Sequence, residues 1–161
     1  MPRCFVSIGS NIDAERNTLS AIDSLRETFG DCQVSPLYLT PAEGFDGDDF
    51  VNAVVAFDSD RSAADIHATL RRIEDRHGRV RGPEKFSSRT LDLDLLLYGD
   101  AVMECERFAL PRDEIERYPF VLKPLCDLCP DCLYPLTGES YQHMWENMAQ
   151  RGSHGLRAIH Y

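Results

Sequence analysis

Residues 89–98, Arg-Thr-Leu-Asp-Leu-Asp-Leu-Leu-Leu-Tyr, contain the pattern on which the fold interpretation depends. From Leu91 onward, leucines alternate with aspartates, and successive side chains of a strand point to opposite faces of a sheet. The pattern predicts a strand over residues 91–98, with Asp92 and Asp94 on one face and leucines on the other. Aspartate favours strands poorly, so two aspartates at this spacing require a physical reason.

A bound cation would supply that reason. Two carboxylates on one face repel each other, and burial disfavours their charged forms. Mg²⁺ binds a small number of carboxylates together with water and substrate phosphates. We therefore interpret Asp92 and Asp94 as metal ligands. The alternative is a strand with one solvent-exposed face, on which the two aspartates have no ligand role.

Five further elements are predicted before this strand. The expected ranges are strands over 4–8, 32–39 and 50–57 and helices over 14–29 and 63–77. Asp13 and Ser62 are expected N-caps, because short polar side chains can accept the free N–H groups of a first helical turn. Gly30 and Gly78 are expected helix ends, since glycine readily adopts the backbone conformation found there.

This element order predicts the fold class. It is β-α-β-β-α-β, followed by helical segments near 120–128 and 139–150. The order favours an α+β protein with a ferredoxin-like βαββαβ core, in which helices cover the faces of a mostly antiparallel sheet in α/β/α layers. A length of 161 residues indicates a single domain over 1–161. Residues 151–161 are expected to form a flexible tail.

Composition and charge limit the possible partners. Hydrophobic residues make up 43% and charged residues 27% of the chain, as in ordinary globular domains. The net charge of −10 disfavours nucleic acid and anionic membranes as partners. The apolar run at the N-terminus is too short for a secretory signal, and no apolar stretch is long enough to span a bilayer. A cytoplasmic location with reduced cysteines is therefore expected.

The segment over residues 71–90 differs in charge from the rest of the chain. It holds seven basic and three acidic residues, a local charge of +4 in a chain whose total is −10. Arg79, Arg81 and Arg89 lie just before the aspartate pair. Phosphoryl transfer depends on metal ions and guanidinium groups that position oxygens and balance developing charge, so the sequence predicts this chemistry. No Walker glycine-rich loop is present. The alternative is a solvated helix end rich in charge.

Together these motifs resemble the 6-hydroxymethyl-7,8-dihydropterin pyrophosphokinase family of folate biosynthesis, over about residues 4–135. The resemblance rests on Ser7-Ile8-Gly9-Ser10-Asn11, Thr40-Pro41, Phe50-Val51-Asn52-Ala53, Gly78-Arg79-Val80-Arg81 and Arg89-Thr90-Leu91-Asp92-Leu93-Asp94. It implies that a pyrophosphoryl group passes from ATP to the hydroxymethyl group of the pterin, with release of AMP. The resemblance also supports the ferredoxin-like core.

The resemblance further implies roles for individual residues. Asp92 and Asp94 would hold two Mg²⁺ ions, and the catalytic arginines would be Arg79, Arg81 and Arg89. The ATP site would comprise Glu74, Arg81, Arg89, Leu95 and Arg112. The pterin site would comprise Thr40, Pro41, Ala42, Phe50, Asn52 and Phe120. The two phenylalanines would stack on the flat ring and the amide would bond its polar edge. The alternative for the phenylalanines is plain core packing.

Four stretches depart from the usual family pattern. Phe86-Ser87-Ser88 replaces Trp-Gly-Pro, Arg112-Asp113 replaces a histidine and its aromatic or proline neighbour, Tyr118 replaces an arginine, and Ala42-Glu43 replaces Pro-Leu. Arg112 or Arg117 is expected to supply the missing positive charge. The departures leave two alternatives open: a paralogue that acts on a modified pterin, and a non-catalytic protein that binds a pterin or a nucleotide.

Cys126, Cys129 and Cys132 have a spacing that is also found in iron–sulfur and zinc sites. A fourth ligand at a suitable spacing is absent, so we favour packing at a helix end, where cysteine behaves as a small apolar residue. A metal–thiolate module is the alternative. The expected assembly is a monomer or a weak homodimer that binds only small molecules, ATP and a pterin.

Overall fold

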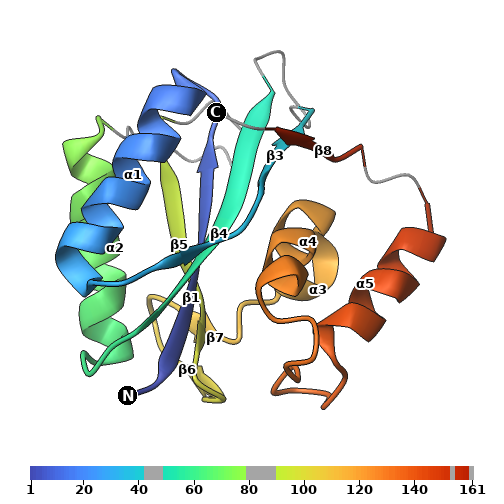
Figure 1. The fold of residues 1–161 in the computed structure, drawn as a ribbon. Helices are drawn as coiled ribbons and strands as arrows, with labels where there is room; N and C mark the ends of the chain where they lie inside the picture. The colour runs from blue at the N-terminus through green and yellow to red at the C-terminus, as the bar shows by residue number, and fades with distance from the viewer. Residues whose placement is uncertain (42–48, 79–89, 153–154, 160–161) are drawn as a thin grey trace.

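The structure, a computed structural model, describes residues 1–41, 49–78, 90–152 and 155–159 (Figure 1). Its main sheet has the strand order β5-β1-β4-β3-β8, with β2 also paired to β4. The strands are β1 (Arg3–Ser10), β2 (Gln33–Val34), β3 (Leu37–Thr40), β4 (Phe50–Asp58), β5 (Asp92–Tyr98) and β8 (Arg157–Ile159). All of these pairings are antiparallel.

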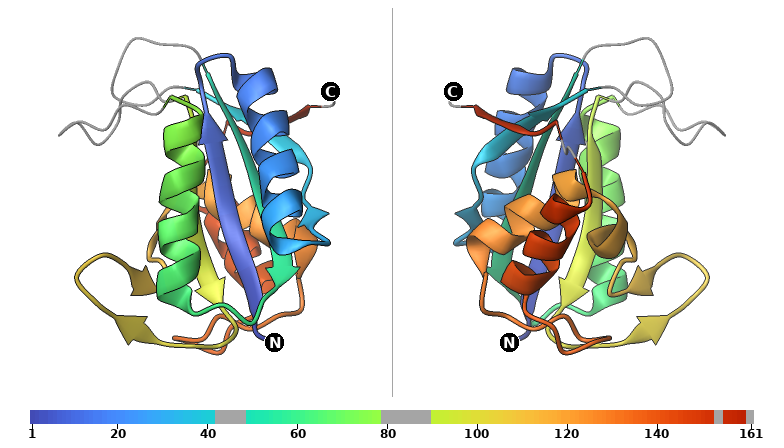
Figure 2. Two further views of the ribbon diagram at one scale, coloured as in Figure 1. Left: turned by 90° about the vertical axis from the view of Figure 1, so that its left-hand side faces the viewer. Right: turned by 90° about the vertical axis from the view of Figure 1, so that its right-hand side faces the viewer.

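Helices cover both faces of the sheet (Figure 2). The helices are α1 (Ala14–Phe29), α2 (Ala63–Arg76), α3 (Glu114–Arg117), α4 (Pro119–Leu128) and α5 (Tyr141–Gln150). One face is covered by α1 and α2, and the other by α3 and α4, with α5 packed against α4. The connection β1-α1-β2/β3-β4-α2-β5, with β1 between β4 and β5, confirms the predicted α+β class and βαββαβ core.

The two long helices match their sequence patterns closely. On α2, Ile66, Leu70 and Ile73 recur every three or four residues and are fully buried against the sheet. Ser62 accepts the Asp65 N–H at 3.1 Å, as its expected N-cap role requires. The expected cap at Asp13 is wrong in detail: this residue has a φ of 44° and makes no side-chain cap.

The predicted strand over 32–39 is interrupted in the structure. It divides into β2 and β3 at Ser35 and Pro36, because proline has no N–H to donate to a neighbouring strand. The Ser35 N–H donates to the Val54 carbonyl oxygen, and the Ser35 hydroxyl accepts the Val54 N–H, both at 2.9 Å. Serine thus keeps the connection to β4 where proline interrupts it.

Two features were not predicted from the sequence. A hairpin of β6 (Met103–Glu104) and β7 (Ala109–Leu110) follows β5. In addition, Arg157–Ile159 pair with β3 as β8, so the expectation of a flexible tail over 151–161 is not met for these three residues. None of the helices in the described ranges is long and apolar enough to cross a membrane.

Candidate active site

A row of paired residues crosses three strands at one end of the sheet. Gly9 on β1 lies opposite Asp92 on β5 and opposite Asn52 on β4. Directly paired residues project to the same face, here the one that carries α3 and α4. A β-carbon placed on Gly9 would lie 3.4 Å from Asn52 Oδ1 and 3.9 Å from Asp92 Cβ. Gly9 lies between Asp92 and Asn52 in the sheet, and because it has no side chain, the space between the carboxylate and the amide is open on this face.

The polar part of the predicted pterin site lies on the same face. Asn52 donates from Nδ2 to the Thr40 hydroxyl oxygen at 2.7 Å, and both residues are buried. Phe50 is opposite Thr40 in the register of β3 and β4. The structure therefore brings together Thr40, Phe50 and Asn52, as expected. Pro41 follows β3 directly, and Ala42 lies outside the described residues.

The second predicted aromatic residue, Phe120, lies in the first turn of α4. Its ring stacks on that of Tyr118, with centroids 5.0 Å apart and planes inclined by 13°. Helix α4 packs on β4 and β3, the strands that carry the rest of the predicted pterin set. The stacked pair explains what the unusual tyrosine does here, because offset aromatic stacking fixes the orientation of both rings.

Asp94 lies among charges of both signs. Its Oδ1 is 3.4 Å from Arg71 Nη2 and 3.8 Å from Arg112 Nη1. Burial raises the pKa of Asp94 to about 7, with further increases from Asp92 and Glu114, while the two arginines oppose the shift. The two guanidinium groups therefore do not fully compensate the carboxylate, and an added cation would be favourable beside it.

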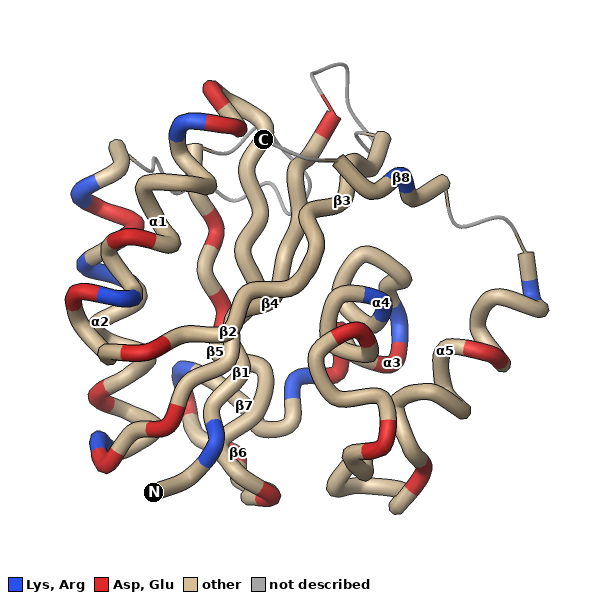
Figure 3. Tube along the Cα trace, viewed as in Figure 1, with Lys and Arg blue, Asp and Glu red and all other residues tan. Residues whose placement is uncertain are grey.

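An ion pair from α2 closes the edge of β5 between the two aspartates. The Leu93 N–H donates to Glu74 Oε2 at 2.7 Å, and Arg71 donates to the Leu93 carbonyl oxygen. Arg71 Nε lies 3.2 Å from Glu74 Oε1. Helix α2 carries charged residues of both signs (Figure 3). Among its described residues, Arg71 and Glu74 are the two whose side chains form hydrogen bonds with the backbone of Leu93. Arg71 was not among the predicted site residues, although its i,i+3 spacing to Glu74 was a signal.

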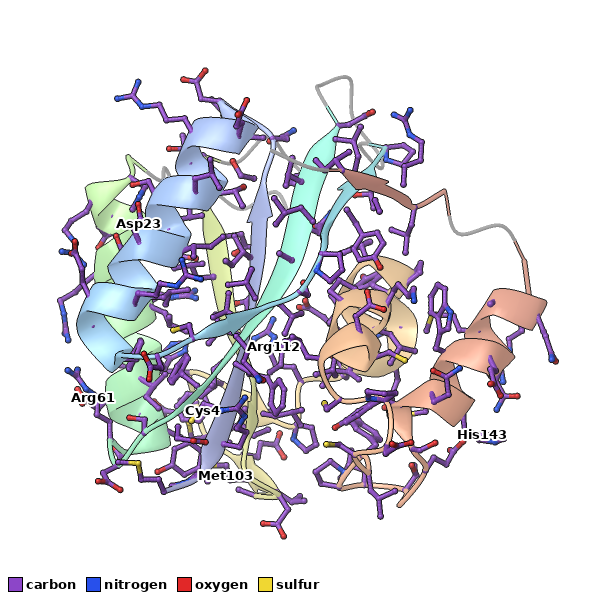
Figure 4. All side chains as sticks on the ribbon, in the orientation of Figure 1. Cys4, Asp23, Arg61, Met103, Arg112 and His143 are labelled. Atoms are coloured by element: carbon purple, nitrogen blue, oxygen red, sulfur yellow. The ribbon has the colours of Figure 1, made fainter. Side chains whose placement is uncertain are left out.

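The residues predicted to bind ATP are only partly brought together. Arg112, which follows β7, lies beside Asp94, and its position in the molecule is labelled in Figure 4. Arg117 is instead an exposed partner of Asp113, at 2.6 Å, so of Arg112 and Arg117 it is Arg112 that reaches Asp94. Glu74 is fully buried, and Leu95 lies in the core on the opposite face with α1 and α2.

Several predicted site residues lie outside the described residues. They are Arg79, Arg81 and Arg89, together with Phe86-Ser87-Ser88. Their roles stay predictions.

The carboxylates suit magnesium better than a metal held by protein ligands alone. Within the described ranges, no group of three or more His, Cys, Asp or Glu side chains is arranged to hold a metal ion. This applies also to Cys126, Cys129 and Cys132. Mg²⁺ needs only a few carboxylates when water and phosphate complete its shell. Arg112 Nε and Thr90 Oγ1 are buried atoms with no hydrogen-bond partner among the described residues, as expected of groups that await a ligand oxygen.

Comparison with known sequences gives consistent relatives. Residues 5–130 match the family described as 7,8-dihydro-6-hydroxymethylpterin-pyrophosphokinase. A 2-amino-4-hydroxy-6-hydroxymethyldihydropteridine pyrophosphokinase of Pseudomonas aeruginosa is 36% identical over 137 residues, covering 83% of this chain and 84% of the relative. The enzyme of the same description from Methylorubrum extorquens is 36% identical over 163 residues, covering 99% of both chains.

Solved structures support the same fold. The chain superimposes on wild-type Plasmodium falciparum HPPK-DHPS with a TM-score of 0.75 and 11% identity, covering 100% of this chain and 48% of that one. The triple mutant of that protein gives a TM-score of 0.78, also at 11% identity, and covers 99% of this chain and 47% of the other. The chain thus spans about half the length of these solved chains, and at such identities the likeness concerns the fold alone.

Proposed function

The chain belongs to the 7,8-dihydro-6-hydroxymethylpterin pyrophosphokinase family, and we infer that it transfers pyrophosphate from ATP to 6-hydroxymethyldihydropterin and releases AMP. One observation supports this assignment most directly. Asp92 and Asn52 project from the same face and are separated only by Gly9. A metal-bound polyphosphate and a flat heterocycle held by these two side chains would meet above the glycine.

The pterin half of the site relies on an oriented amide and aromatic surfaces. Because Asn52 Nδ2 donates to Thr40, its Oδ1 is directed elsewhere and can accept an N–H from the amide-like edge of a pterin. Phe50 and Phe120 would supply the stacking faces. The stack of Tyr118 on Phe120 holds one of these rings in place before the substrate binds, which reduces the entropy lost on binding.

The phosphate half of the site relies on charge. We propose that Asp92 and Asp94 hold two Mg²⁺ ions, which when bound would neutralise phosphate oxygens of ATP. Arg112 lies next to Asp94 with one buried N–H donor still unpaired among the described residues, so it would bond a phosphate oxygen. We assign Arg79, Arg81 and Arg89 to the same task and Glu74 and Leu95 to the nucleotide site.

The reaction requires alignment more than covalent participation by the protein. The pterin hydroxyl oxygen would attack the β-phosphorus of ATP in line, the bond from that phosphorus to the bridging oxygen of AMP would break, and the hydroxyl proton would pass to solvent. Positive charge around the transferred group lowers the barrier to such a step. We further propose that the protein acts in the cytoplasm as a monomer or weak homodimer, without nucleic acid or membrane partners.

The decisive experiment measures AMP release from ATP with 6-hydroxymethyl-7,8-dihydropterin. Asp92→Ala and Asp94→Ala are each expected to lower kcat at least about a thousandfold, because each change removes one of the two carboxylates that would hold the Mg²⁺ ions. Asp100→Ala changes an exposed turn after β5 and serves as the matched control. Normal AMP release by either site variant would overturn the metal assignment. Binding of both ligands by the wild type without AMP would favour a non-catalytic relative.

A further inference from the structure

Cys129 and Cys132 lie at the two ends of a tight turn that follows α4 and precedes α5. The turn is Cys129-Pro130-Asp131-Cys132, and the Cys132 N–H donates to the Cys129 carbonyl oxygen at 3.2 Å. Such a bond defines a β-turn, whose first and last Cα atoms lie within about 7 Å. Disulfides usually join Cα atoms about 4.4–6.8 Å apart. The turn therefore keeps the Cα atoms of the two cysteines near the range that disulfides span.

The two thiols differ in exposure. Both are free, Cys132 is exposed and Cys129 is half-buried. The Cys129 thiol donates to the Leu125 carbonyl oxygen at 3.6 Å, and burial, followed by the neighbouring Cys132, raises the pKa of Cys129. A reagent in solution thus meets Cys132 first and finds a second thiol next to it.

Backbone contacts fix the turn from both sides. The Cys129 N–H donates to the Leu125 carbonyl oxygen at 3.1 Å, which ties the turn to the last residues of α4. From the start of α5, the Tyr141 N–H donates to the Cys132 carbonyl oxygen at 3.0 Å, and the Gln142 N–H donates to that of Pro130 at 2.9 Å. The cysteines are therefore placed in advance, and closing a bond between them would require little ordering of the chain.

A cavity of about 240 Å³ opens beside the turn. Arg3, Gln33 and Tyr141 line it together with the two cysteines. Arg3 begins β1, whereas Gly9 of the candidate active site lies near the other end of that strand. Arg3 brings a positive charge to this cavity, while burial and Cys132 still leave the pKa of Cys129 raised. The cavity thus gives a small anionic reagent access to the thiols at a place separate from the active site.

We propose that Cys129 and Cys132 form a dithiol site that reacts with low-molecular-weight disulfides such as oxidised glutathione. The Cys132 thiolate attacks one sulfur of the reagent, forms a mixed disulfide and releases one thiolate. Cys129 then loses its proton to solvent and its sulfur attacks Cys132, forming the protein disulfide and releasing the second thiolate. In total, one small disulfide is reduced to two thiols while the two cysteines are oxidised to one disulfide.

The test treats the reduced full chain with oxidised glutathione and maps the products by peptide mass spectrometry. The expected product is a Cys129–Cys132 disulfide, two hydrogen atoms lighter than the dithiol peptide, which dithiothreitol reverses. Cys129→Ser is expected to stop the reaction at a lasting glutathione adduct on Cys132. Cys132→Ser is expected to abolish the disulfide. Thermal melting and AMP release report that each variant is folded, independently of thiol chemistry.

Two other cysteines provide internal comparisons. Cys105 is an exposed thiol in the hairpin region, and Cys105→Ser is expected to leave formation of the disulfide unchanged. Cys126 is buried and donates to Gln142 Oε1 at 3.3 Å, so it is expected to remain reduced. A lasting glutathione adduct on wild-type Cys132, a Cys126–Cys129 bond, or modification of Cys105 without reaction at Cys132 would each overturn the proposal.

Discussion

At Asp94 the folded chain holds a carboxylate where burial and the neighbouring Asp92 both disfavour its charge. The pKa rises from 3.8 to about 7, so the folded state favours the protonated form. The resulting contribution to stability is present below the unfolded pKa and is lost as pH rises towards 7. The same local repulsion makes the position favourable for a metal ion. Function and stability therefore oppose each other at this residue.

The first prediction follows from that opposition. In metal-free buffer, Asp94→Asn is expected to match the wild type in free energy of unfolding near pH 4. At pH 8 it is expected to be more stable by roughly 1–4 kcal/mol, since one pKa unit corresponds to about 1.4 kcal/mol. Urea unfolding at both pH values measures the difference. Asp100→Asn is the control, and an equal effect of Asp94→Asn at both pH values would contradict the prediction.

The second prediction concerns the Thr40 hydroxyl, which orients the side-chain amide of Asn52. Thr40→Val keeps the shape of the side chain but leaves Asn52 Nδ2 without its 2.7 Å acceptor. An unpaired buried donor costs about 1–3 kcal/mol, and the amide can rotate away from the substrate. We expect KM for the pterin to rise about tenfold while KM for ATP stays within twofold. Thr40→Ser should restore most of the affinity, and a change in kcat alone would contradict this role.

At the scale of elements, the edge of β5 depends on α2. Leu93 lies between the two aspartates, and its N–H and carbonyl oxygen are bonded by Glu74 and Arg71. An edge strand otherwise presents unpaired backbone groups. The pair therefore completes the hydrogen bonding of the strand where its path determines the separation of Asp92 and Asp94. This accounts for a glutamate that is fully buried.

The third prediction concerns the clamp that Arg71 and Glu74 form on the backbone of Leu93, and the test is Arg71→Met. The change removes the donor to Leu93 and leaves the Glu74 carboxylate without its close cation, which is strongly unfavourable for a buried charge. We expect the Mg²⁺ concentration for half-maximal activity to rise about tenfold, with a loss of about 1–3 kcal/mol in stability. Arg72→Met, the same substitution one position along α2, is the control.

A conservative substitution separates positioning from general support. Arg71→Lys keeps the charge and one donor, so it should recover part of the Mg²⁺ dependence. A loss of stability in Arg71→Met with unchanged Mg²⁺ dependence would show that the clamp supports the fold but does not position the ligands.

At the scale of the whole molecule, the C-terminal segment joins the sheet beside the predicted pterin site. β8 pairs with β3, which ends at Thr40. A β-carbon on Gly155 would lie 3.6 Å from Pro41 Cδ, so the approach to β8 runs close to Pro41, a residue of the predicted pterin site. Residues more than a hundred positions apart in the chain thus support one edge of the site.

The fourth prediction removes that support. A chain that ends at Leu156 lacks β8 and exposes the edge of β3, which should cost about 1–2 kcal/mol by loss of strand hydrogen bonds. We expect KM for the pterin to rise severalfold, with kcat at saturating substrate little changed. Arg157→Pro in the full chain is the matched variant, because Arg157 lies opposite Leu39 and proline has no N–H to donate to β3 there. Unaltered pterin kinetics in both would show that β8 has no part in the site.

Features that depend on periodicity could be predicted from the amino-acid sequence. The alternation around Asp92 and Asp94 predicted their shared face, and apolar spacing predicted α1 and α2 to within one residue, because both signals arise from local backbone geometry. The family motifs identified Asn52 and Thr40. Local signals could not predict β8, since a three-residue strand with exposed side chains carries almost no pattern and forms only because β3 offers a free edge.

How the elements meet follows from tertiary packing. Packing places Arg112 but not Arg117 beside Asp94, puts Leu95 in the core away from the aspartates, brings Arg71 to the same aspartate and stacks Tyr118 on Phe120. These outcomes depend on distances between elements remote in the chain. Such distances are set by the packing of helices on a sheet, and packing depends on shape and burial over the whole molecule, which no short stretch of sequence contains.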